Sequence, residues 1–190
     1  SVSLFEKQNL MVVLDVVPSV EGRYSSETDI KNIACELRNR LNVGQISDVY
    51  LEFISFHGII GKDGATKLNI ENYHTFMLEI PELSSINTVS NNGDFVNNFV
   101  IPNDTFGISN DENTQTDSDG LDIAVTTKLT SSVMKLKSSY MCTVDPKTFD
   151  RFTITLKGLK HSTALNASGE VLKSNDVKSR LQIGMMFKAR

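Results

Sequence analysis

Histidines are the residues in this sequence best suited to metal binding or acid–base chemistry, and their spacing decides whether they do either. The three histidines are His57, His74 and His161. None has a second histidine or a cysteine at the short spacing that is typical of a zinc site. We therefore expect each histidine to be structural. The alternative is a zinc site at which His57 and His74, far apart in the chain, meet an acid in space.

The two cysteines, Cys35 and Cys142, are far apart and form no CxxC pair. Two lone cysteines in a chain of this size are typical of reduced, buried thiols in a cytosol-like compartment. A single long-range disulfide is the alternative. Cys142 lies in an expected strand with no histidine beside it, so we interpret it as an inert thiol rather than a nucleophile.

Acidic side chains gather in the polar stretch 109–120 (SNDENTQTDSDG), which contains four acids. Asp117 and Asp119, followed by Gly120, resemble part of an EF-hand loop, because oxygen ligands at alternate positions can surround Ca²⁺. Placing Gly120 at the sixth position of such a loop puts Gln115 where the first acid is needed. We therefore interpret this stretch as a solvated loop, with a calcium site as the alternative.

The remaining candidates for chemistry are weaker still. Glu79 and Glu82 flank Pro81, but acids at strand ends are common and do not by themselves indicate a glycosidase pair. No GxSxG, HExxH or P-loop pattern occurs. Asn103 and Asn166 match the N-glycosylation pattern, although the cysteine usage argues against secretion. We predict no catalytic, cofactor-binding or metal-binding residues, no cofactor and no enzymatic activity.

Charge and aromatic content narrow the classes of partner. The net charge of −4 argues against binding to a nucleic-acid backbone. Basic residues occur near the C-terminus, interrupted by acids, and we interpret this stretch as a solvated or subunit-facing edge: Lys173, Lys178, Arg180, Lys188 and Arg190. No apolar run is long enough to span a membrane. Ten Phe, four Tyr and no Trp weaken a carbohydrate-binding interpretation, since sugars usually stack on Trp or Tyr.

The elements that would position these residues are mostly strands. Short apolar or alternating runs, bounded by glycine, proline or polar clusters, predict strands at 10–17, 48–57, 73–80, 94–101, 121–127, 132–136, 140–144, 149–159 and 181–187. Gly58, Gly61 and Gly64 indicate a turn region. The apolar residues from Ile30 to Leu41 follow helical spacing, which predicts one helix over residues 28–41.

Turns and loops rather than helices separate these strands, so the sequence predicts an all-β fold: an antiparallel two-sheet β-sandwich. The jelly roll is the commonest eight-stranded sandwich, and we expect a single jelly roll with one short helix near the N-terminus. The 190 residues suffice for one domain. We predict a single jelly-roll domain over residues 1–190, with residues 1–9 as an N-terminal arm and residues 109–120 as a long polar loop.

Three segments carry a resemblance to a known family. They are 49–57 with FMLEIPEL at 76–83, FVIPN at 99–103, and VDPKTF at 144–149 with FTITL at 152–156 and the apolar strand at 181–187. Their order resembles the small jelly-roll capsid proteins of large nucleocytoplasmic DNA viruses and their relatives. In that family a strand ending L-E-I-x-E-L precedes a polar loop, a strand enters I-P-N, and a P-K-T-F turn leads into an alternating strand. The resemblance spans roughly residues 45–190.

The resemblance implies a structural protein of an icosahedral virion, assembled in the host cytoplasm, without catalytic residues or direct nucleic-acid contact. The partners implied are other capsid subunits, including the major capsid protein, and further copies of this chain. A penton at the vertices would be a pentamer, whereas a minor capsid protein would lie beneath the major shell; a single sandwich fits a vertex slightly better. The helix expected at 28–41 departs from the family, where an extended segment is usual. The alternatives are a carbohydrate- or receptor-binding β-sandwich and a hydrolase whose site is assembled from distant residues.

Overall fold

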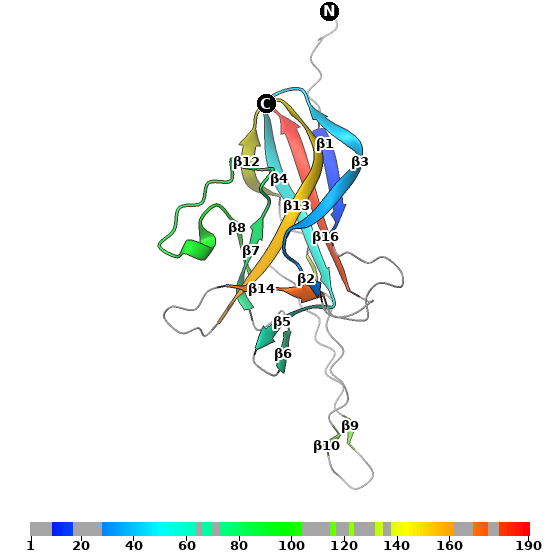
Figure 1. The fold of residues 1–190 in the computed structure, drawn as a ribbon, viewed down its shortest axis with the longest axis vertical. Coiled ribbons are helices and arrows are strands. Elements are labelled where there is room, and N and C mark those ends of the chain that lie inside the picture. Colours follow the sequence, from blue (N-terminus) through cyan, green and yellow to red (C-terminus); the bar gives the residue numbers. More distant parts are fainter. Residues whose placement is uncertain are drawn as a thin grey trace, which may run out of the picture.

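Antiparallel strands make up almost all of the regular structure of this protein (Figure 1). A computed structural model describes residues 9–16, 28–63, 66–69, 73–103, 115–116, 122–123, 132–134, 138–161, 169–174 and 179–190. Within these residues the helical conformation is limited to η2, a single 3₁₀ turn at Gly93–Phe95, and to Asn103. The predicted all-β, antiparallel architecture is therefore confirmed.

The first of two five-stranded sheets contains both ends of the described chain. Its strands are β1 (Asn9–Asp15), β16 (Arg180–Ala189), β4 (Ser47–His57), β11 (Ser132–Met134) and β12 (Ser139–Val144). They lie in the order β1-β16-β4, and β11 and β12 both pair with β4. The strands nearest the two termini are thus neighbours in the sheet.

The second five-stranded sheet is organised around the long strand β13. Its strands are β3 (Ile33–Val43), β13 (Lys147–Lys160), β7 (Tyr73–Glu79), β8 (Phe99–Pro102) and β14 (Glu170–Val171). The first half of β13 pairs with β3, and the second half pairs with β7 and β14. Strand β8 pairs with β7.

Two smaller sheets complete the described strands. One has the order β2-β15-β5-β6 and contains β2 (Thr28–Asp29), β15 (Lys173–Ser174), β5 (Ile59–Asp63) and β6 (Thr66–Asn69). The other pairs β9 (Gln115–Thr116) with β10 (Asp122–Ile123). Gly58 links β4 to β5 with φ +62°, a conformation that favours glycine.

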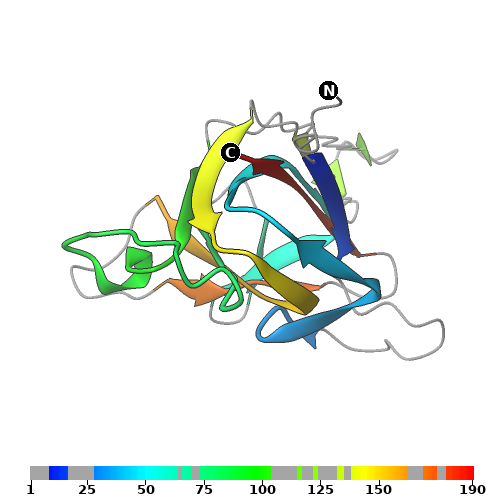
Figure 2. The same ribbon diagram turned by 90° about the horizontal axis from the view of Figure 1, so that it is seen from above.

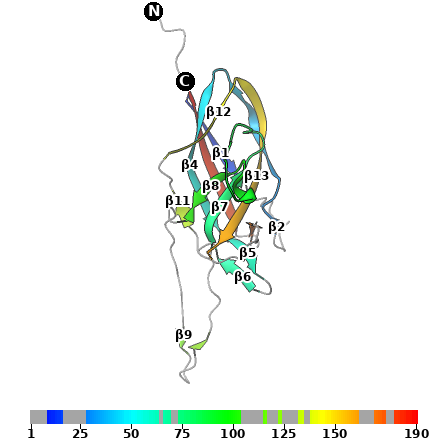
Figure 3. The same cartoon turned by 90° about the vertical axis from the view of Figure 1, so that its left-hand side faces the viewer.

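The hydrophobic core lies between the two large sheets, which face each other (Figures 2 and 3). Phe149 and Phe152 of β13 stack with ring centroids 5.1 Å apart, and Phe187 of β16 lies 5.8 Å from Phe149. Ile154 and Leu156 continue the inward face of β13 and are fully buried. Each such side chain contributes about 1.5–3 kcal/mol on burial. The arrangement is consistent with a two-sheet β-sandwich.

The helix predicted over residues 28–41 is wrong, because β2 and β3 occupy this segment. Ile33, Cys35 and Leu37 are half-buried, whereas the residues between them are exposed. The sequence therefore satisfies a strand period of two as well as the helical period. Pairing with β13 supplies backbone hydrogen bonds and an apolar surface, and these tertiary contacts override the local preference.

Six of the nine predicted strands are found in the structure, and the other three are found in part. Those at 10–17, 48–57, 73–80, 140–144, 149–159 and 181–187 correspond to β1, β4, β7, β12, β13 and β16. The prediction at 94–101 is correct only for its end, because η2 precedes β8. Those at 121–127 and 132–136 are found in part, as β10 and β11. Gly61 lies inside β5 rather than in a turn. Most of the polar stretch 109–120, together with Gly64, lies outside the described residues.

Candidate functional site

The pairing of β7 with β13 brings two of the three histidines together. The rings of His74 and His161 are perpendicular, with centroids 5.2 Å apart, and His74 Nδ1 lies 2.8 Å from Thr75 Oγ1. Among the described residues no group of three or more His, Cys, Asp or Glu side chains could hold a metal ion. Sequence reasoning missed this contact because the two residues meet only through strand register. The side chain of His57 lies outside the described part of the structure.

Both cysteines are free thiols, so the disulfide alternative is wrong. Burial raises the pKa of Cys35 to about 11, and the nearby carboxylates of Asp15 and Glu82 raise it further in the same direction. Burial likewise raises the pKa of Cys142. A thiol with a raised pKa is protonated at neutral pH and is a poor nucleophile.

Of the acids and asparagines that the sequence singled out, Glu82 and Asn103 have structural contacts. Glu82 accepts hydrogen bonds from both the backbone N–H and the hydroxyl of Thr153, which ties the loop after β7 to β13. The Asn103 side chain is buried and donates to the Tyr73 carbonyl, so it is inaccessible to glycosylation in the folded chain. The second glycosylation motif, at Asn166, and the proposed calcium ligands lie outside the described residues.

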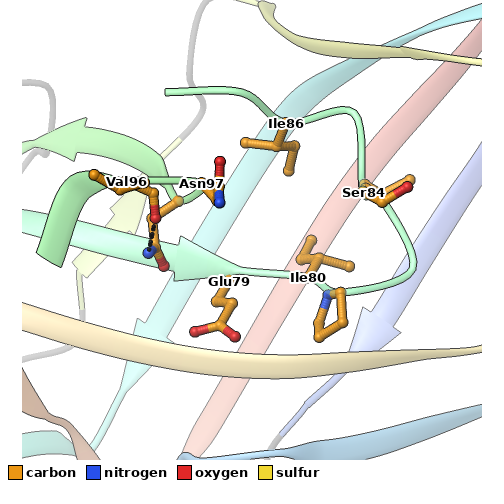
Figure 4. Close-up of a pocket in the computed structure, with 9 residues that line it drawn as sticks. Glu79, Ile80, Ser84, Ile86, Val96 and Asn97 are labelled. Atoms are coloured by element: carbon orange, nitrogen blue, oxygen red, sulfur yellow. Dashed lines mark hydrogen bonds between the residues drawn. The ribbon is translucent and has the colours of Figure 1, made fainter. Parts of the chain in front are cut away.

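A pocket of about 390 Å³ opens where β7 ends and the chain returns toward β8. It is lined by Glu79, Ile80, Pro81, Leu83, Ser84, Ile86, Val96, Asn97 and Asn98. Figure 4 shows Ile80 and Ile86 on one side and Val96 and Asn97 on the other. Ile80, Leu83 and Ile86 are buried and belong to the hydrophobic core, whereas Ser84, Val96 and Asn97 are exposed at the rim, so the surface open to the pocket is more polar than apolar. Such a volume is within the usual range for small-ligand pockets.

Asn98 is the exception to this division, because it is polar and only 6% exposed. Its Nδ2 donates to the Val96 carbonyl over 3.0 Å (Figure 4). Since a carbonyl can only accept, the atom on that side must be the amide nitrogen, and the opposite atom must be the oxygen. Among the described residues this Oδ1 is the one buried side-chain polar atom without a hydrogen-bond partner. This acceptor is buried beside the pocket and has almost no accessible surface.

A second feature is the outer face of the first sheet, defined as the side turned away from the core. Strand register places Met11, Met186, Tyr50 and Tyr140 in one row across four strands. Met11 and Tyr140 are 45% and 53% exposed, and Tyr50 and Tyr140 meet edge-to-face. The apolar row is unusual for a solvated sheet face, where polar residues normally alternate with the buried ones.

The neighbouring row of the outer face is also apolar. Val13, 53% exposed, lies opposite Gly184, which in turn lies opposite Phe53. The Phe53 ring covers Gly184 so closely that a Cβ at this glycine would lie 2.1 Å from a ring carbon. The first row spans β1, β16, β4 and β12 and the second spans β1, β16 and β4, with Glu52 lying between Tyr50 and Phe53 at the register shift of β4. We call these two rows the apolar outer face.

Charged residues border this surface at both ends of the strands. At one end Arg180 pairs with Asp15 at 3.1 Å, and hydrogen bonds from Arg180 and Gln182 hold the pKa of Asp15 below its ordinary value. At the other end Arg190 pairs with Asp48 at 3.0 Å. These basic residues are exposed and paired with acids of other strands.

Further along the charged C-terminal stretch, Lys188 Nζ lies 4.7 Å from the Tyr50 ring centroid, and Lys173 pairs with Asp29 at 3.4 Å. Lys178 lies outside the described residues. An apolar centre with a charged border is the usual composition of a protein–protein interface.

In the part of the chain that the structure describes, no helix is long and apolar enough to cross a membrane. Comparisons with protein-family models, with curated proteins and with solved structures found no match for this chain.

Proposed function

We propose that this protein is a structural subunit of an icosahedral virion, built as a single jelly roll and acting through subunit–subunit contacts without catalysing a reaction. Its position would be a vertex penton or a minor capsid protein. Its partners would be other capsid subunits, including the major capsid protein, and further copies of the chain. Assembly in the host cytoplasm follows from the same proposal and agrees with the two free thiols.

The observation that carries the proposal is the order in which strands pair. Taken in chain order, the eight principal strands are β1, β3, β4, β7, β8, β12, β13 and β16. The first pairs with the eighth, the second with the seventh, the third with the sixth and the fourth with the fifth. This is an antiparallel ribbon, and its rolling up accounts for the pairing of β16 with β4 and of β13 with β7. This strand pairing supports the proposed jelly roll, a fold that capsid and lectin domains use.

The corrected segment 28–41 supports the same proposal. The resemblance to small capsid proteins leads us to expect extended chain there, and the helix predicted from the sequence was the departure. The structure has β2 and β3 in this segment. The main conflict between the resemblance and the local sequence pattern is thereby removed.

The apolar outer face supplies a surface for subunit contact. The two rows lie two residues apart, so four strands of about 4.8 Å width over roughly four residues of about 3.4 Å each cover roughly 260 Å². A stable interface between two chains usually buries about 800 Å² on each partner. This face alone would therefore give a weak contact, which suits a shell in which many contacts form at once.

The competing interpretation, a carbohydrate-binding sandwich, would need a flat aromatic platform. Tyr50, which is partly buried, and Tyr140, which is exposed, form an aromatic pair on the outer face, but their ring planes lie 72° apart. A T-shaped pair does not present two coplanar rings to a sugar. The aromatic geometry therefore favours packing against protein over sugar stacking.

Immunogold labelling and quantitative mass spectrometry of purified particles from the source material test the proposal. We expect the chain in the particle shell, in a fixed ratio to the major capsid protein. A chain found in infected material but missing from washed particles would contradict it.

Variants test the outer face. Met11→Glu and Val13→Glu should leave the melting temperature unchanged while reducing incorporation into particles, because both side chains are exposed. Val89→Glu is the matched control, since Val89 is 91% exposed and belongs to neither apolar row. Equal incorporation of all three variants would show that another surface makes the contact.

A further inference from the structure

Strand β1 forms one edge of the first sheet, and among the described strands it pairs with β16 alone (Figure 2). The hydrogen bond from the Val16 N–H to the Leu181 carbonyl continues the register of β1 with β16 by one residue. Because the backbone groups of an antiparallel strand turn to alternate sides, every second residue before Val16 also bonds to β16. The backbone groups of the residues between them point out of the sheet: Asn9, Met11, Val13 and Asp15. This row of donors and acceptors is a template for another strand.

The edge of β1 lacks the features that protect the other edges of the two large sheets. Strand β3 carries the exposed charged residues Glu36, Arg38 and Arg40, and its register with β13 is broken. The register of β12 with β4 is also broken, and β8 has four residues and ends at Pro102. Strand β1 has seven residues, an unbroken register, no proline and a single charge, on its last residue, Asp15. It is therefore the edge best suited to strand pairing.

The sequence of β1 is complementary to a second copy of itself in the antiparallel orientation. A two-fold axis beside Val12 would pair all seven residues, with Asn9 opposite Asp15, Leu10 opposite Leu14 and Met11 opposite Val13. Residues whose backbone points outward then meet residues of the same kind, as an antiparallel ladder requires. No like charges lie opposite each other. Shifting the register by two residues in either direction leaves two residues of each strand unpaired.

We propose that the edge of β1 binds β1 of a second copy of this chain, which gives a two-fold dimer with one sheet continuous across both copies. Met11 and Val13 form the central hydrogen-bonded pairs, and Val12 faces its counterpart. Cys35 Sγ lies 4.0 Å from the Asp15 carbonyl oxygen, so β3 approaches the edge at this end and the central pairs carry the contact. Each chain has one such edge and a two-fold contact uses both, so assembly through it stops at the dimer.

The size of this contact predicts a weak dimer. Seven residues of about 3.4 Å each, along an edge about 10 Å deep, cover roughly 240 Å² on each copy. A stable interface usually buries about 800 Å² on each partner. The inference does not rest on the virion role. If the chain is a virion subunit, the contact favours a minor capsid protein, since copies around a vertex are related by a five-fold rather than a two-fold axis.

Analytical ultracentrifugation of the purified chain, from about 10 µM to 1 mM, tests the proposal in a range where weak contacts are populated. We expect a concentration-dependent equilibrium between monomer and dimer, without larger species. A monomer at every concentration, or growth beyond the dimer, would overturn the proposal. Particles take no part in this experiment, so its failure would leave the virion proposal standing, and the reverse also holds.

Two double variants test the register. Met11→Lys with Val13→Lys places lysine opposite lysine, whereas Met11→Lys with Val13→Glu places lysine opposite glutamate. Both variants lose the same exposed apolar side chains, so their melting temperatures should agree. We expect the lysine–glutamate variant to dimerise about tenfold more tightly. General charge repulsion would act the other way, because the chain is acidic and the double-lysine variant has the smaller net charge. Equal association of the two variants would refute the pairing.

Two single variants separate the edge from the apolar outer face. Val13→Pro removes an outward N–H and leaves the hydrogen bonds to β16 intact, so it should abolish the dimer. Met186→Lys adds a charge to the outer face on β16, away from the edge, and should leave the dimer unchanged. The reverse result would show that the faces rather than the edges make the contact. If Val13→Pro lowers the melting temperature, the two double variants decide the question.

Discussion

Replacing Gly158 by alanine is expected to destabilise the chain strongly, although it adds a single methyl group. Gly158 lies in β13 beneath the fully buried ring of Tyr73. A Cβ at this position would lie 2.5 Å from Tyr73 Cδ1, whereas ordinary contact begins at 3.4 Å. The backbone of Gly61 lies close to the Tyr73 hydroxyl on another side, since a Cβ built there would lie 1.4 Å from its oxygen, so the ring has little room to tilt away.

The magnitude follows from what must move. Shifting the Tyr73 ring by about 1 Å in a packed interior costs about 1–3 kcal/mol. The same shift strains the hydrogen bond from the Tyr73 hydroxyl to Glu170 Oε2, now 2.7 Å, whose carboxylate also pairs with Lys160 at 2.8 Å. A hydrogen bond to a charged group contributes about 1.5–3 kcal/mol. We expect a loss of about 3–5 kcal/mol, which for a domain of this size lowers the melting temperature by roughly 10 °C.

Urea and thermal unfolding measure the effect, and the chain supplies matched controls. A Cβ at Gly44 or Gly93 would meet no atom within 4 Å, so Gly44→Ala and Gly93→Ala should be neutral or slightly stabilising. In a Tyr73→Leu background the added cost of Gly158→Ala should largely disappear, because the clashing ring is gone. A Gly158→Ala variant as stable as the two control variants, or one whose cost persists without the Tyr73 ring, would refute the reasoning.

Three further predictions concern the core, a thiol and an ion pair. Phe152→Asp and Ile154→Asp should each unfold the chain, since both side chains are fully buried and an unpaired charge there is costly; native-like circular dichroism melting of either would contradict the core assignment. Cys35, with a pKa of about 11 against an ordinary value of 9.0, should react with iodoacetamide at pH 8 about a hundredfold more slowly than a free thiol, and comparable rates would contradict its burial. Asp15→Asn should lower stability at neutral pH. Because the pKa of Asp15 is lowered by Arg180, its contribution is present above about 3.8 and is lost as the pH falls through the lowered value, so wild type and variant should converge in acid unfolding curves.

The local sequence pattern predicted the strands whose two faces differ. Along β13, Phe152, Ile154 and Leu156 alternate with more polar neighbours, and this period is incompatible with a helix. Along β3 the apolar residues fit both the strand period of two and the helical period, so only the pairing with β13 decides which structure forms. Local pattern carries no information about a partner strand more than a hundred residues away.

The pocket and the histidine contact could not be predicted for the same reason. The unused acceptor of Asn98 arises because its amide turns back to the Val96 carbonyl, next to Asn97, whose φ is +59°. The left-handed backbone of Asn97 is part of the loop conformation, which the local sequence pattern does not specify. His74 meets His161 through the register of β7 with β13, and neither residue has a local signal for the other.

Strand β1 carries apolar residues on its outer face that the hydrophobic core does not use. Its inward residues, among them Val12 and Leu14, already pack in the core, so Met11 and Val13 add exposed apolar surface without contributing to it. A strand that is apolar on both faces also specifies its register poorly, because a slip of one residue exchanges similar side chains. Here the ion pair of Asp15 opposes the slip, since a shift by one would turn this carboxylate toward the core. Two exposed apolar residues that weaken register and add nothing to the core are accounted for if another subunit covers them.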